Sequence, residues 1–395
     1  MSQRISVGID IGTYQIKVVV AEDVKNENGI TSARVIGSGY IESKGLRHGY
    51  ILNTPDVARS LKIAITQAER TSKIRIKRAY VSIGGIGISG IMSKGSVMIS
   101  KADSEITDLD VRNVLAVAEE ELSQNSLMNK KIVHAIPVSY KIDGQVVIGR
   151  PAGMRGTKLE VKALFVTCLE QHLNDLIKAV EEAGVEVLDV MASPLAASIV
   201  SLTKVQKIAG CVLANIGSET VSIVVFENNT PISLEVFPIG STDITNDIAL
   251  GFKIPIDEAE HVKMGSVLSD SQYPRKKLEE IILARLSDIF DLVEVHLKKI
   301  GRSGLLPAGI VLTGGGASLS TIEEIAKDSL KLPSKVASIN FISNIKNSQL
   351  SDSSWSVAYG LAVWGISNSS DIPTGIRLPR NTIKKMTDWF GQFLP

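Results

Sequence analysis

Two stretches of the sequence repeat one pattern of apolar and polar positions. Residues 7–20 read VGIDIGTYQIKVVV and residues 212–225 read VLANIGSETVSIVV, so an apolar run, a glycine turn and a second β-branched run follow one another in both. Each stretch predicts two antiparallel strands joined by a tight hairpin. Asn215 stands opposite Asp10 in this repeat. We therefore expect two similarly built domains that face each other, each supplying one loop.

The chemistry of the two turns suits a phosphate group. A tight glycine turn directs backbone N–H groups and a hydroxyl toward one point, and a nearby carboxylate suits the divalent cation that accompanies a phosphate. Asp10 is the carboxylate of the first turn and would hold a metal ion through water. The candidate phosphate-binding residues are Asp10, Gly12, Thr13, Tyr14 and Gln15 in the first turn and Asn215, Gly217, Ser218, Glu219 and Thr220 in the second.

The segment after the first hairpin predicts a strand, a helix and a second strand. Residues 34–42 alternate as a strand, and the helix begins at Thr54, a capping hydroxyl, with Pro55 at the first helical position. The helix ends near Arg70. Its apolar face consists of Val57, Leu61, Ile65 and Ala68. Residues 73–78 alternate Lys or Arg with Ile, which predicts a strand with a solvated cationic face.

A change of pattern after this strand predicts an inserted unit. Residues 85–90 read GIGISG, but a dinucleotide-binding motif requires a helix after its glycines, and the continuation through Gly95 is β-like. We therefore exclude a dinucleotide site. A helix capped near Thr107 and the strands after it predict a compact α+β unit over residues 84–167. His134 lies in one of these strands and is better explained as a structural than as a catalytic residue.

Helices dominate the second half of the chain. The longest is predicted at residues 276–300 from apolar side chains at helical spacing, Leu292 among them, and it follows a polar loop at 265–273. Two further helices are predicted at residues 169–183 and 256–264. Two more are predicted to begin at Thr245 and near Leu319.

A third glycine loop follows a buried strand at residues 309–318, GIVLTGGGAS. Glycines allow the backbone to approach a planar ligand closely. The loop has no Gly-Lys-Ser/Thr and is therefore not a P-loop. A tight turn that requires positive φ explains the glycines equally well, so both interpretations stay open.

The C-terminal residues predict an amphipathic helix. A polar linker at residues 367–380 leads to a helix in which apolar side chains form one stripe, a composition typical of helices that lie in a membrane interface. A tail helix docked on its own domain would show the same stripe. The candidate membrane-binding residues are Ile383, Lys384, Lys385, Met386, Trp389, Phe390, Phe393 and Leu394.

Composition narrows the class of protein. A chain of 395 residues exceeds the roughly 250–300 at which one core usually splits, so two or more domains are expected. The net charge of +1 does not favour a nucleic-acid partner, and five scattered histidines do not favour a metal-cluster enzyme. Cys168 and Cys211 suggest buried, reduced thiols of a cytosolic protein. The sequence shows neither a secretion signal nor the ~18-residue apolar run of a membrane-spanning helix, so we expect a protein that is neither secreted nor membrane-spanning.

The two hairpins, the segment that connects them and the third glycine loop resemble the actin and Hsp70 superfamily of ATP-binding proteins. Within it, the chain resembles the FtsA family of bacterial cell-division proteins over almost its whole length. Local similarities are residues 134–137, 166–168, 245–249 and 308–315 and the tryptophan-containing tail. The resemblance implies an α/β, actin-like (ribonuclease H-like) two-domain fold with an inserted α+β subdomain, the SHS2-like 1C.

The same resemblance implies a division of the chain into subdomains and a tail. These are 1A at residues 1–83 and 168–209, 1C at 84–167, 2A at 210–240, 2B at 241–304, a closing 2A/1A segment at 305–366, a linker at 367–380 and a membrane-targeting helix at 381–395.

The function implied by the resemblance is that of a cytoskeletal adaptor in cell division. Such a protein binds ATP and Mg²⁺, polymerises beneath the cytoplasmic membrane as a peripheral protein and tethers FtsZ filaments to it at the division septum. Its 2B subdomain binds the C-terminal peptide of FtsZ, for which Arg285 is the candidate here, although an ordinary solvated arginine explains it at least as well. Other division proteins would dock on 1C. Further implied nucleotide contacts are Gly240, Glu260, Lys263, Gly314, Gly315, Gly316 and Ala317.

The second turn departs from the family pattern, which reads Asp-Ile-Gly-Gly-Gly-Thr. Asn215 removes a carboxylate and Glu219 adds a negative charge near the polyphosphate, so both predict weaker Mg-ATP binding unless Glu219 turns away or helps to bind the metal. Ser241 and Thr242 alter two residues of a Gly-Gly-Asn stretch. The residue that positions the attacking water in the superfamily corresponds to Ser193, which is too short and too weakly basic. We expect ATP turnover to be very slow or absent.

Two alternatives belong to the same superfamily. A PilM-like pilus-assembly adaptor would share the fold and the inserted unit but lack the amphipathic tail. A sugar kinase would need a catalytic aspartate near the second turn, and neither Asn215 nor Ser218 supplies one.

Overall fold

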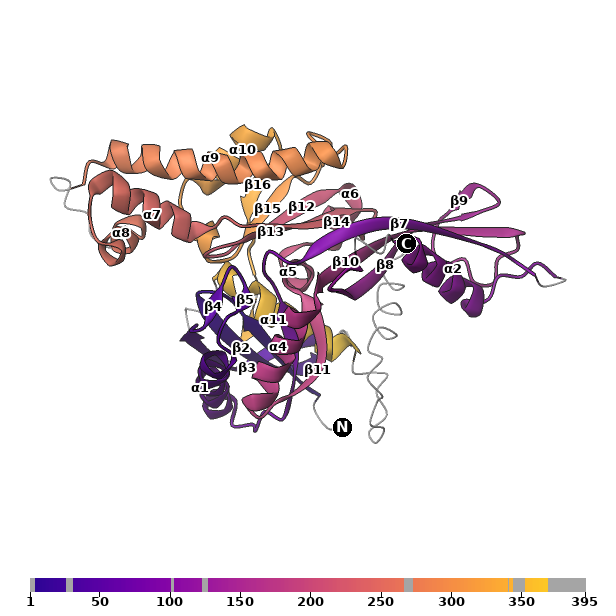
Figure 1. Ribbon diagram of the computed structural model, residues 1–395, viewed down its shortest axis with the longest axis horizontal. Helices are drawn as coiled ribbons and strands as arrows, with labels where there is room; N and C mark the ends of the chain where they lie inside the picture. Colours follow the sequence, from indigo (N-terminus) through magenta and orange to yellow (C-terminus); the bar gives the residue numbers. More distant parts are fainter. Residues whose placement is uncertain are drawn as a thin grey trace.

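The computed structural model describes residues 4–25, 31–100, 103–122, 127–265, 273–339, 341–343 and 352–368. Two large mixed sheets, a smaller sheet and a short hairpin carry the strands, with helices on both sides of the large sheets (Figure 1). The predicted α/β class is confirmed. Within the described residues, no helix has the length and apolar character to cross a membrane.

The first large sheet has the strand order β11-β6-β1-β2-β3-β17. Its strands are β1 (Ile5–Ile11), β2 (Gln15–Lys25), β3 (Thr31–Glu42), β6 (Arg78–Ile83), β11 (Glu186–Ala192) and β17 (Ile342–Ser343). β1 and β2 pair antiparallel from Ile5 opposite Glu22 to Ile11 opposite Ile16, so the first predicted hairpin is confirmed. β6 runs parallel to β1 on its other side.

The second large sheet, β14-β13-β12-β15-β16, repeats this arrangement. Its strands are β12 (Cys211–Ile216), β13 (Val221–Glu227), β14 (Thr230–Phe237), β15 (Ile310–Thr313) and β16 (Ser334–Val336). β12 and β13 form an antiparallel hairpin, β14 follows as its third strand and β15 runs parallel to β12. The predicted duplication is therefore present in the topology as well as in the hairpins.

Two helices between the large sheets hold them together. α5 (Ser193–Ser201) packs on α11 (Ser356–Asn368) and on β12 and β13, whereas α11 packs on β1, β2 and β6. The two helices touch backbone to backbone, because a Cβ added to Gly360 would lie 2.0 Å from the carbonyl oxygen of Ala196. One apolar core consequently contains Leu195 of α5 together with Val18 of the first sheet and Leu213 of the second.

The predicted inserted unit is a four-stranded antiparallel sheet with α2 packed on it. Its elements are β7 (Ser89–Met98), α2 (Asp108–Glu120), β8 (Lys130–Ile142), β9 (Gln145–Val147) and β10 (Lys158–Leu169), in the strand order β7-β10-β8-β9. A strand, not a helix, follows the 85–90 glycines, which agrees with the exclusion of a dinucleotide site. The unit has its own core, and its base packs against β14 (Figure 1).

The remaining elements surround the second sheet or cover the first. They are β4 (Leu46–Arg47), β5 (Tyr50–Ile51), α1 (Thr54–Ser72), α4 (Glu170–Glu182), α6 (Lys204–Ala209), α7 (Ser241–Phe252), α8 (Ile256–Lys263), α9 (Arg275–Lys299), the 3₁₀ turns η1 (Gly315–Ser318) and η3 (Ser353–Trp355), and α10 (Ile322–Leu330). The polar loop predicted at 265–273 lies largely outside the described residues, and the predicted tail lies wholly outside them.

Two predictions around α1 were wrong. The cap is Asn53 and not Thr54, since the Asn53 side chain accepts the N–H of Asp56. The strand predicted at residues 73–78 is a connection, and β6 begins only at Arg78. Residues 73–78 alternate like a strand because this connection buries the Ile76 side chain in the core. The Ile76 N–H donates to the side chain of Glu69 and not to a neighbouring strand.

Two helix starts and one core residue were also predicted wrongly. α7 begins at Ser241 rather than Thr245, because Gly240 and Asp243 form a capping interaction through the Gly240 N–H, 2.8 Å from Asp243 Oδ2. α10 begins at Ile322 and not at Leu319, because the backbone of Leu319 is extended, with φ −68° and ψ 127°. Leu292 lies on the solvent side of α9 and is 37% exposed.

His134 and the two cysteines have the structural roles that were expected. The His134 ring is buried, and its Nε2 accepts the N–H of Ala192 over 2.9 Å, at the junction between β11 and α5. Burial lowers the pKa of His134 to about 3. Cys168 and Cys211 are both buried free thiols, and burial raises the pKa of each to about 12.

The pKa of His134 predicts a specific pH dependence of stability. Below about pH 6.5 the His134 ring is protonated in the unfolded chain, whereas in the folded protein it stays neutral down to about pH 3. The contribution of this residue to the free energy of unfolding should therefore fall by about 1.4 kcal/mol for each pH unit of acidification. The stability difference between wild type and His134→Gln, measured by urea unfolding, should shrink by that amount on acidification. A difference that does not change with pH would contradict the assignment.

The contact between α5 and α11 predicts that Gly360→Ala destabilises the protein. The added methyl group overlaps the Ala196 carbonyl and forces the helices apart, which should cost about 3 kcal/mol or more. Gly315→Ala is the matched control, because nothing lies within 4 Å of its added Cβ. Equal thermal midpoints for the two variants would show that the helices do not need this close approach.

Candidate functional site

The turns of the two hairpins have the same geometry. The N–H of Gly12 donates to the carbonyl of Gln15 over 3.2 Å, and the N–H of Gly217 donates to the carbonyl of Thr220 over 2.9 Å. A Cβ would lie 2.8 Å from the carbonyl oxygen in the first turn and 2.9 Å in the second. Both turns therefore require glycine for the same steric reason.

Asp10 lies in a half-buried position at the end of β1. Its Oδ1 accepts the hydroxyl of Ser82, 2.8 Å away on the neighbouring strand β6. Burial raises the pKa of Asp10, while the Ser82 hydrogen bond and the nearby Lys17 ammonium oppose that rise. In the described part of the chain, no three His, Cys, Asp or Glu side chains come together as metal ligands. The Mg²⁺ assigned to Asp10 stays a prediction.

The first turn is fastened to the short β4–β5 hairpin. Thr13 Oγ1 accepts the N–H of Gly49 over 3.0 Å, and the Ser43 hydroxyl donates to the carbonyl of Gly12 over 2.6 Å. Tyr14 is exposed at the tip, and Gln15 begins β2. The turn is thus held on one side, with the Thr13 hydroxyl already engaged as an acceptor.

The second turn is held by the N-terminus of α7. The N–H groups of Ser241 and Thr242 donate to the carbonyls of Gly217 and Ser218 over 2.9 and 2.8 Å. Gly240 allows this approach, because a Cβ there would lie 2.3 Å from the Ser218 carbonyl oxygen. The two residues that depart from the Gly-Gly-Asn pattern therefore still support the loop through their backbone.

Glu219 connects the second turn to the first domain. Its Oε2 accepts the N–H of His48 over 2.5 Å, and its carbonyl oxygen lies 3.2 Å from His48 Nδ1. Since the next residue, Gly49, donates to Thr13, the two turns are linked through adjacent residues of one short hairpin. The Glu219 carboxylate thus lies between the two turns and does not point away into solvent.

The third glycine loop lies against the second turn. A Cβ on Gly314 would lie 2.4 Å from Asn215 Oδ1 and 2.5 Å from the Ile216 carbonyl oxygen, and its φ of +90° favours glycine. Gly316 packs on the Ile216 side chain, whereas Gly315 faces open space. The turn interpretation therefore accounts for Gly314 and Gly316, and Gly315 with the adjacent Ala317 stays a candidate ligand contact.

Glu260 and Lys263 lie on α8 beside the N-terminus of α7. Lys263 Nζ is 2.7 Å from Glu260 Oε2 and donates to Thr245 Oγ1 over 2.8 Å and to the Ser241 carbonyl over 3.2 Å. The Lys263 side chain is almost completely buried, whereas Glu260 is partly exposed. Lys263 therefore fastens α8 to α7, and Glu260 is the more accessible of the two.

Two further predicted positions are occupied by intramolecular contacts. The Ser193 hydroxyl donates to the carbonyl of Ile83 over 3.0 Å and is buried. Arg285 forms a bidentate pair with Asp247, at 2.6 and 3.0 Å, and lies 3.4 Å from Asp288. The Asp247 hydrogen bond raises the pKa of Arg285. The arginine is not a plain solvated side chain, since two carboxylates already balance it.

Sequence reasoning missed several residues of this site. Ser82 could have been found, because it ends an apolar strand that runs parallel to β1 and so meets Asp10 at the same sheet edge. His48 and Gly49 carry only a weak turn signal, and Thr245 looks like an ordinary helical residue. Their contacts to Glu219, Thr13 and Lys263 depend on tertiary structure.

Family models match two parts of the chain. The model of the cell division protein FtsA matches residues 212–360, and that of the SHS2 domain inserted in FtsA matches residues 85–167. The cell division protein FtsA of Bacillus subtilis (strain 168) is 32% identical over 361 residues, which cover 86% of this chain and 80% of that protein. The chain belongs to the FtsA family of cell-division proteins.

Solved structures agree with the fold of an FtsA protein. A chain of the PilM-PilN type IV pilus biogenesis complex matches with a TM-score of 0.68 at 17% identity, covering 91% of this chain and 98% of that one. MreB 5 of Spiroplasma citri, bound to AMPPNP, matches with a TM-score of 0.52 at 15% identity, covering 95% and 100%. These matches concern the fold alone, and the actin-like fold predicted from the sequence is confirmed.

Proposed function

We propose that this FtsA protein binds ATP between its two glycine turns, assembles into filaments on the cytoplasmic face of the cell membrane and tethers FtsZ filaments there at the division septum. The observation that carries the nucleotide part is the pair of equivalent turns held face to face through His48 and Gly49. In the fold relative MreB 5, the bound molecule is AMPPNP. The other parts of the proposal rest on membership of the family.

The residues around the turns fit a bound nucleotide. The Gly12–Thr13 and Gly217–Thr220 turns would offer backbone donors to phosphate groups. Gly315 and Glu260 are proposed to contact the adenosine. Asp10 has one oxygen bound to Ser82 and would use the other to hold a water molecule of Mg²⁺. When bound, Mg²⁺ would neutralise phosphate charge between the domains.

The proposed site is built for binding rather than rapid hydrolysis. Ser193, the residue at the position of the water-positioning side chain, is buried and hydrogen-bonded to Ile83, so it offers no free base. The lack of a free base at Ser193 also disfavours a sugar kinase. Such an enzyme would need a catalytic carboxylate near the second turn, and Asn215 supplies an amide. We propose very slow or absent turnover, with ATP acting as a structural ligand.

Arg285 is proposed to contact the C-terminal peptide of FtsZ. Asp247 and Asp288 hold the guanidinium on the surface shared by α7 and α9, at 29% side-chain exposure. An acidic peptide would have to share this arginine with both carboxylates. Membrane attachment is proposed for the amphipathic tail at 381–395, and this tail favours the tether over a PilM-like adaptor.

The position of the Glu219 carboxylate predicts how the affinities for Mg-ATP and Mg-ADP change when its charge is removed. A carboxylate between the phosphate loops repels each added phosphate charge, so Glu219→Gln should bind Mg-ATP about tenfold more tightly than wild type and should change Mg-ADP affinity less. Isothermal titration calorimetry measures both. Glu186→Gln, an exposed change at the start of β11, is the control. Unchanged ATP affinity in Glu219→Gln would show that the carboxylate does not face the phosphates.

Liposome sedimentation tests the membrane tether. Full-length protein should sediment with anionic vesicles, whereas a truncated protein that ends at Asn368 should stay in the supernatant, because it lacks the apolar stripe and the tail lysines. Trp389→Glu with Phe390→Glu should behave like the truncation, and Asn381→Asp with Gln392→Glu, which adds the same two negative charges at polar positions of the tail, is the matched control. Equal sedimentation of the full-length and truncated proteins would refute the tether.

A further inference from the structure

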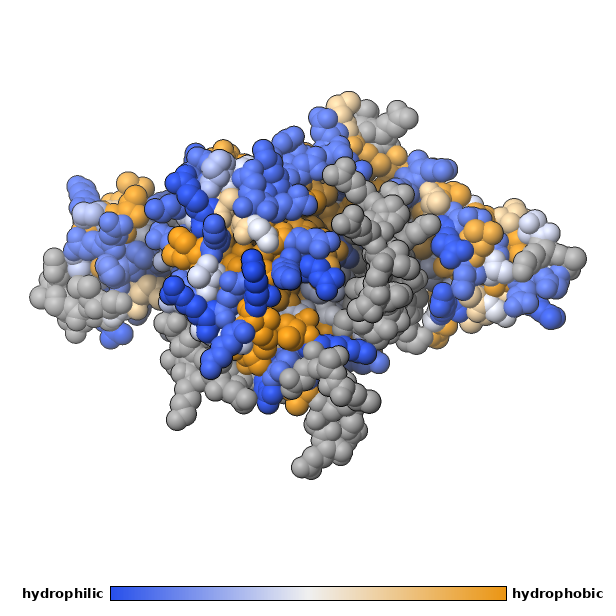
Figure 2. Space-filling model, turned by 90° about the horizontal axis from the view of Figure 1, so that it is seen from below, coloured by the Kyte–Doolittle hydropathy of each residue, from blue (hydrophilic) through white to orange (hydrophobic). Residues whose placement is uncertain are grey.

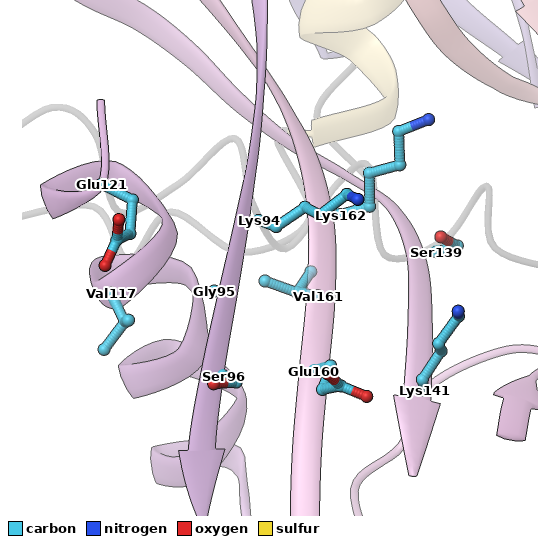
Figure 3. Close-up of a pocket in the computed structure, with 10 residues that line it drawn as sticks. All are labelled: Lys94, Gly95, Ser96, Val117, Glu121, Ser139, Lys141, Glu160, Val161 and Lys162. Atoms are coloured by element: carbon cyan, nitrogen blue, oxygen red, sulfur yellow. The ribbon is translucent and has the colours of Figure 1, made fainter. Parts of the chain in front are cut away.

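A hollow of about 400 Å³ lies on the inserted unit, away from the proposed nucleotide site. Residues of three strands, β7, β10 and β8, line it together with Val117 of α2 and Glu121, the residue that follows this helix (Figure 3). Figure 3 shows Val117 and Glu121 on one side of β7 and the residues of β10 and β8 on the other side. The hollow therefore extends across the sheet from β8 to β7, the edge strand that α2 lies beside.

The strand face of this hollow carries a net positive charge, because Lys94, Lys141 and Lys162 are balanced only in part by the Glu160 carboxylate beside them. Lys94 of β7 lies directly opposite Lys162 of β10, and Lys141 of β8 lies opposite Glu160. Glu160 is already paired with Lys158, 2.9 Å away. Among the described residues, no acidic side chain forms an ion pair with Lys94, Lys141 or Lys162. Two lysines opposite each other on neighbouring strands repel, and a bound anionic group would relieve this repulsion.

β7 is also an edge strand with room for a partner. It pairs with β10 from Ser89 to Met98, and the described residues provide no strand on its other side along 93–98. Its first residues abut the second domain, because a Cβ on Gly90 would lie 3.0 Å from the backbone of Leu234. The second half of the strand edge is therefore open for backbone pairing.

The helix beside this edge would support an added strand. Gly95 allows α2 to lie directly under β7, since a Cβ there would be 2.3 Å from the carbonyl oxygen of Val114. Val117, one turn further along α2, lines the hollow next to the strand. Exposed apolar side chains, Met98 and Val146 among them, lie between polar ones on this unit, and Figure 2 shows the mixture at the right-hand end of the molecule.

We propose that the edge of β7 from Ser93 to Met98 binds an extended acidic segment of a partner protein as an additional strand. Alternate side chains of that segment would meet Lys94 and Lys162 on the open face of the sheet, and those between them would meet Val117 on the helix side. The lysines disfavour pairing with basic or identical strands and accept an acidic one. This inference deepens, and rests on, the proposed role of the inserted unit in docking other division proteins.

A synthetic peptide of alternating glutamate and valine tests the charge requirement. Fluorescence anisotropy with the full-length protein at low salt should show binding, and a lysine–valine peptide of equal length should not bind. The variant Lys94→Gln, Lys141→Gln, Lys162→Gln should bind at least about tenfold more weakly. The variant Lys327→Gln, Lys331→Gln, Lys335→Gln changes net charge equally at exposed sites outside the hollow and should bind as wild type does. Equal losses in both variants would overturn the proposal.

Hydrogen exchange tests the edge of the strand. The acidic peptide should slow amide exchange in residues 93–98 of β7, and absence of that protection would overturn strand addition. A thermal melt of Lys94→Gln checks folding. This single variant should have a higher thermal midpoint than the unbound wild type, because the substitution removes the repulsion with Lys162.

The variant Lys94→Gln, Lys141→Gln, Lys162→Gln should still sediment with anionic vesicles as wild type does. Loss of sedimentation would show that these lysines bind lipid and would overturn the proposal. The peptide assays contain no nucleotide, lipid or FtsZ, so their failure is distinct from failure of the proposed function.

Discussion

The close packing of α5 on α11 is the constraint on which the rest of the molecule depends. Gly360 allows the two helix backbones to touch at Ala196, and the same pair of helices contributes apolar side chains to a core shared by both large sheets. The turns that end β1 and β12 can face each other only while this core fixes the sheets. The Glu219 and Thr13 bonds to the β4–β5 hairpin then connect the turns themselves.

The two domains share the backbone geometry of their turns and differ in side-chain chemistry. Gly12 and Gly217 make the same hydrogen bond in the same type of turn. Asp10, however, corresponds to Asn215, and the second turn carries Glu219, whose carboxylate bonds to the first domain. In the proposed function, the two turns keep the backbone frame of a nucleotide site. The Glu219 carboxylate, which lies in that site, also holds the two domains together.

The sequence predicted those parts of the fold that local patterns determine. The alternation in residues 7–20 and 212–225 predicted both hairpins, and the Thr107 capping pattern predicted α2. The strand assigned to residues 73–78 failed because alternation also arises in a connection that buries one side chain, Ile76. The Glu219–His48 bond was out of reach, because it joins residues 171 positions apart whose meeting depends on domain packing.

In the proposed function, an actin-like frame that binds a nucleotide forms filaments on a membrane. Electron microscopy of the purified full-length protein on anionic lipid monolayers, with and without ATP, tests membrane binding and assembly together. We expect filaments on the lipid when ATP is present. A monolayer without filaments under these conditions, or filaments that form in solution and leave the lipid bare, would contradict it.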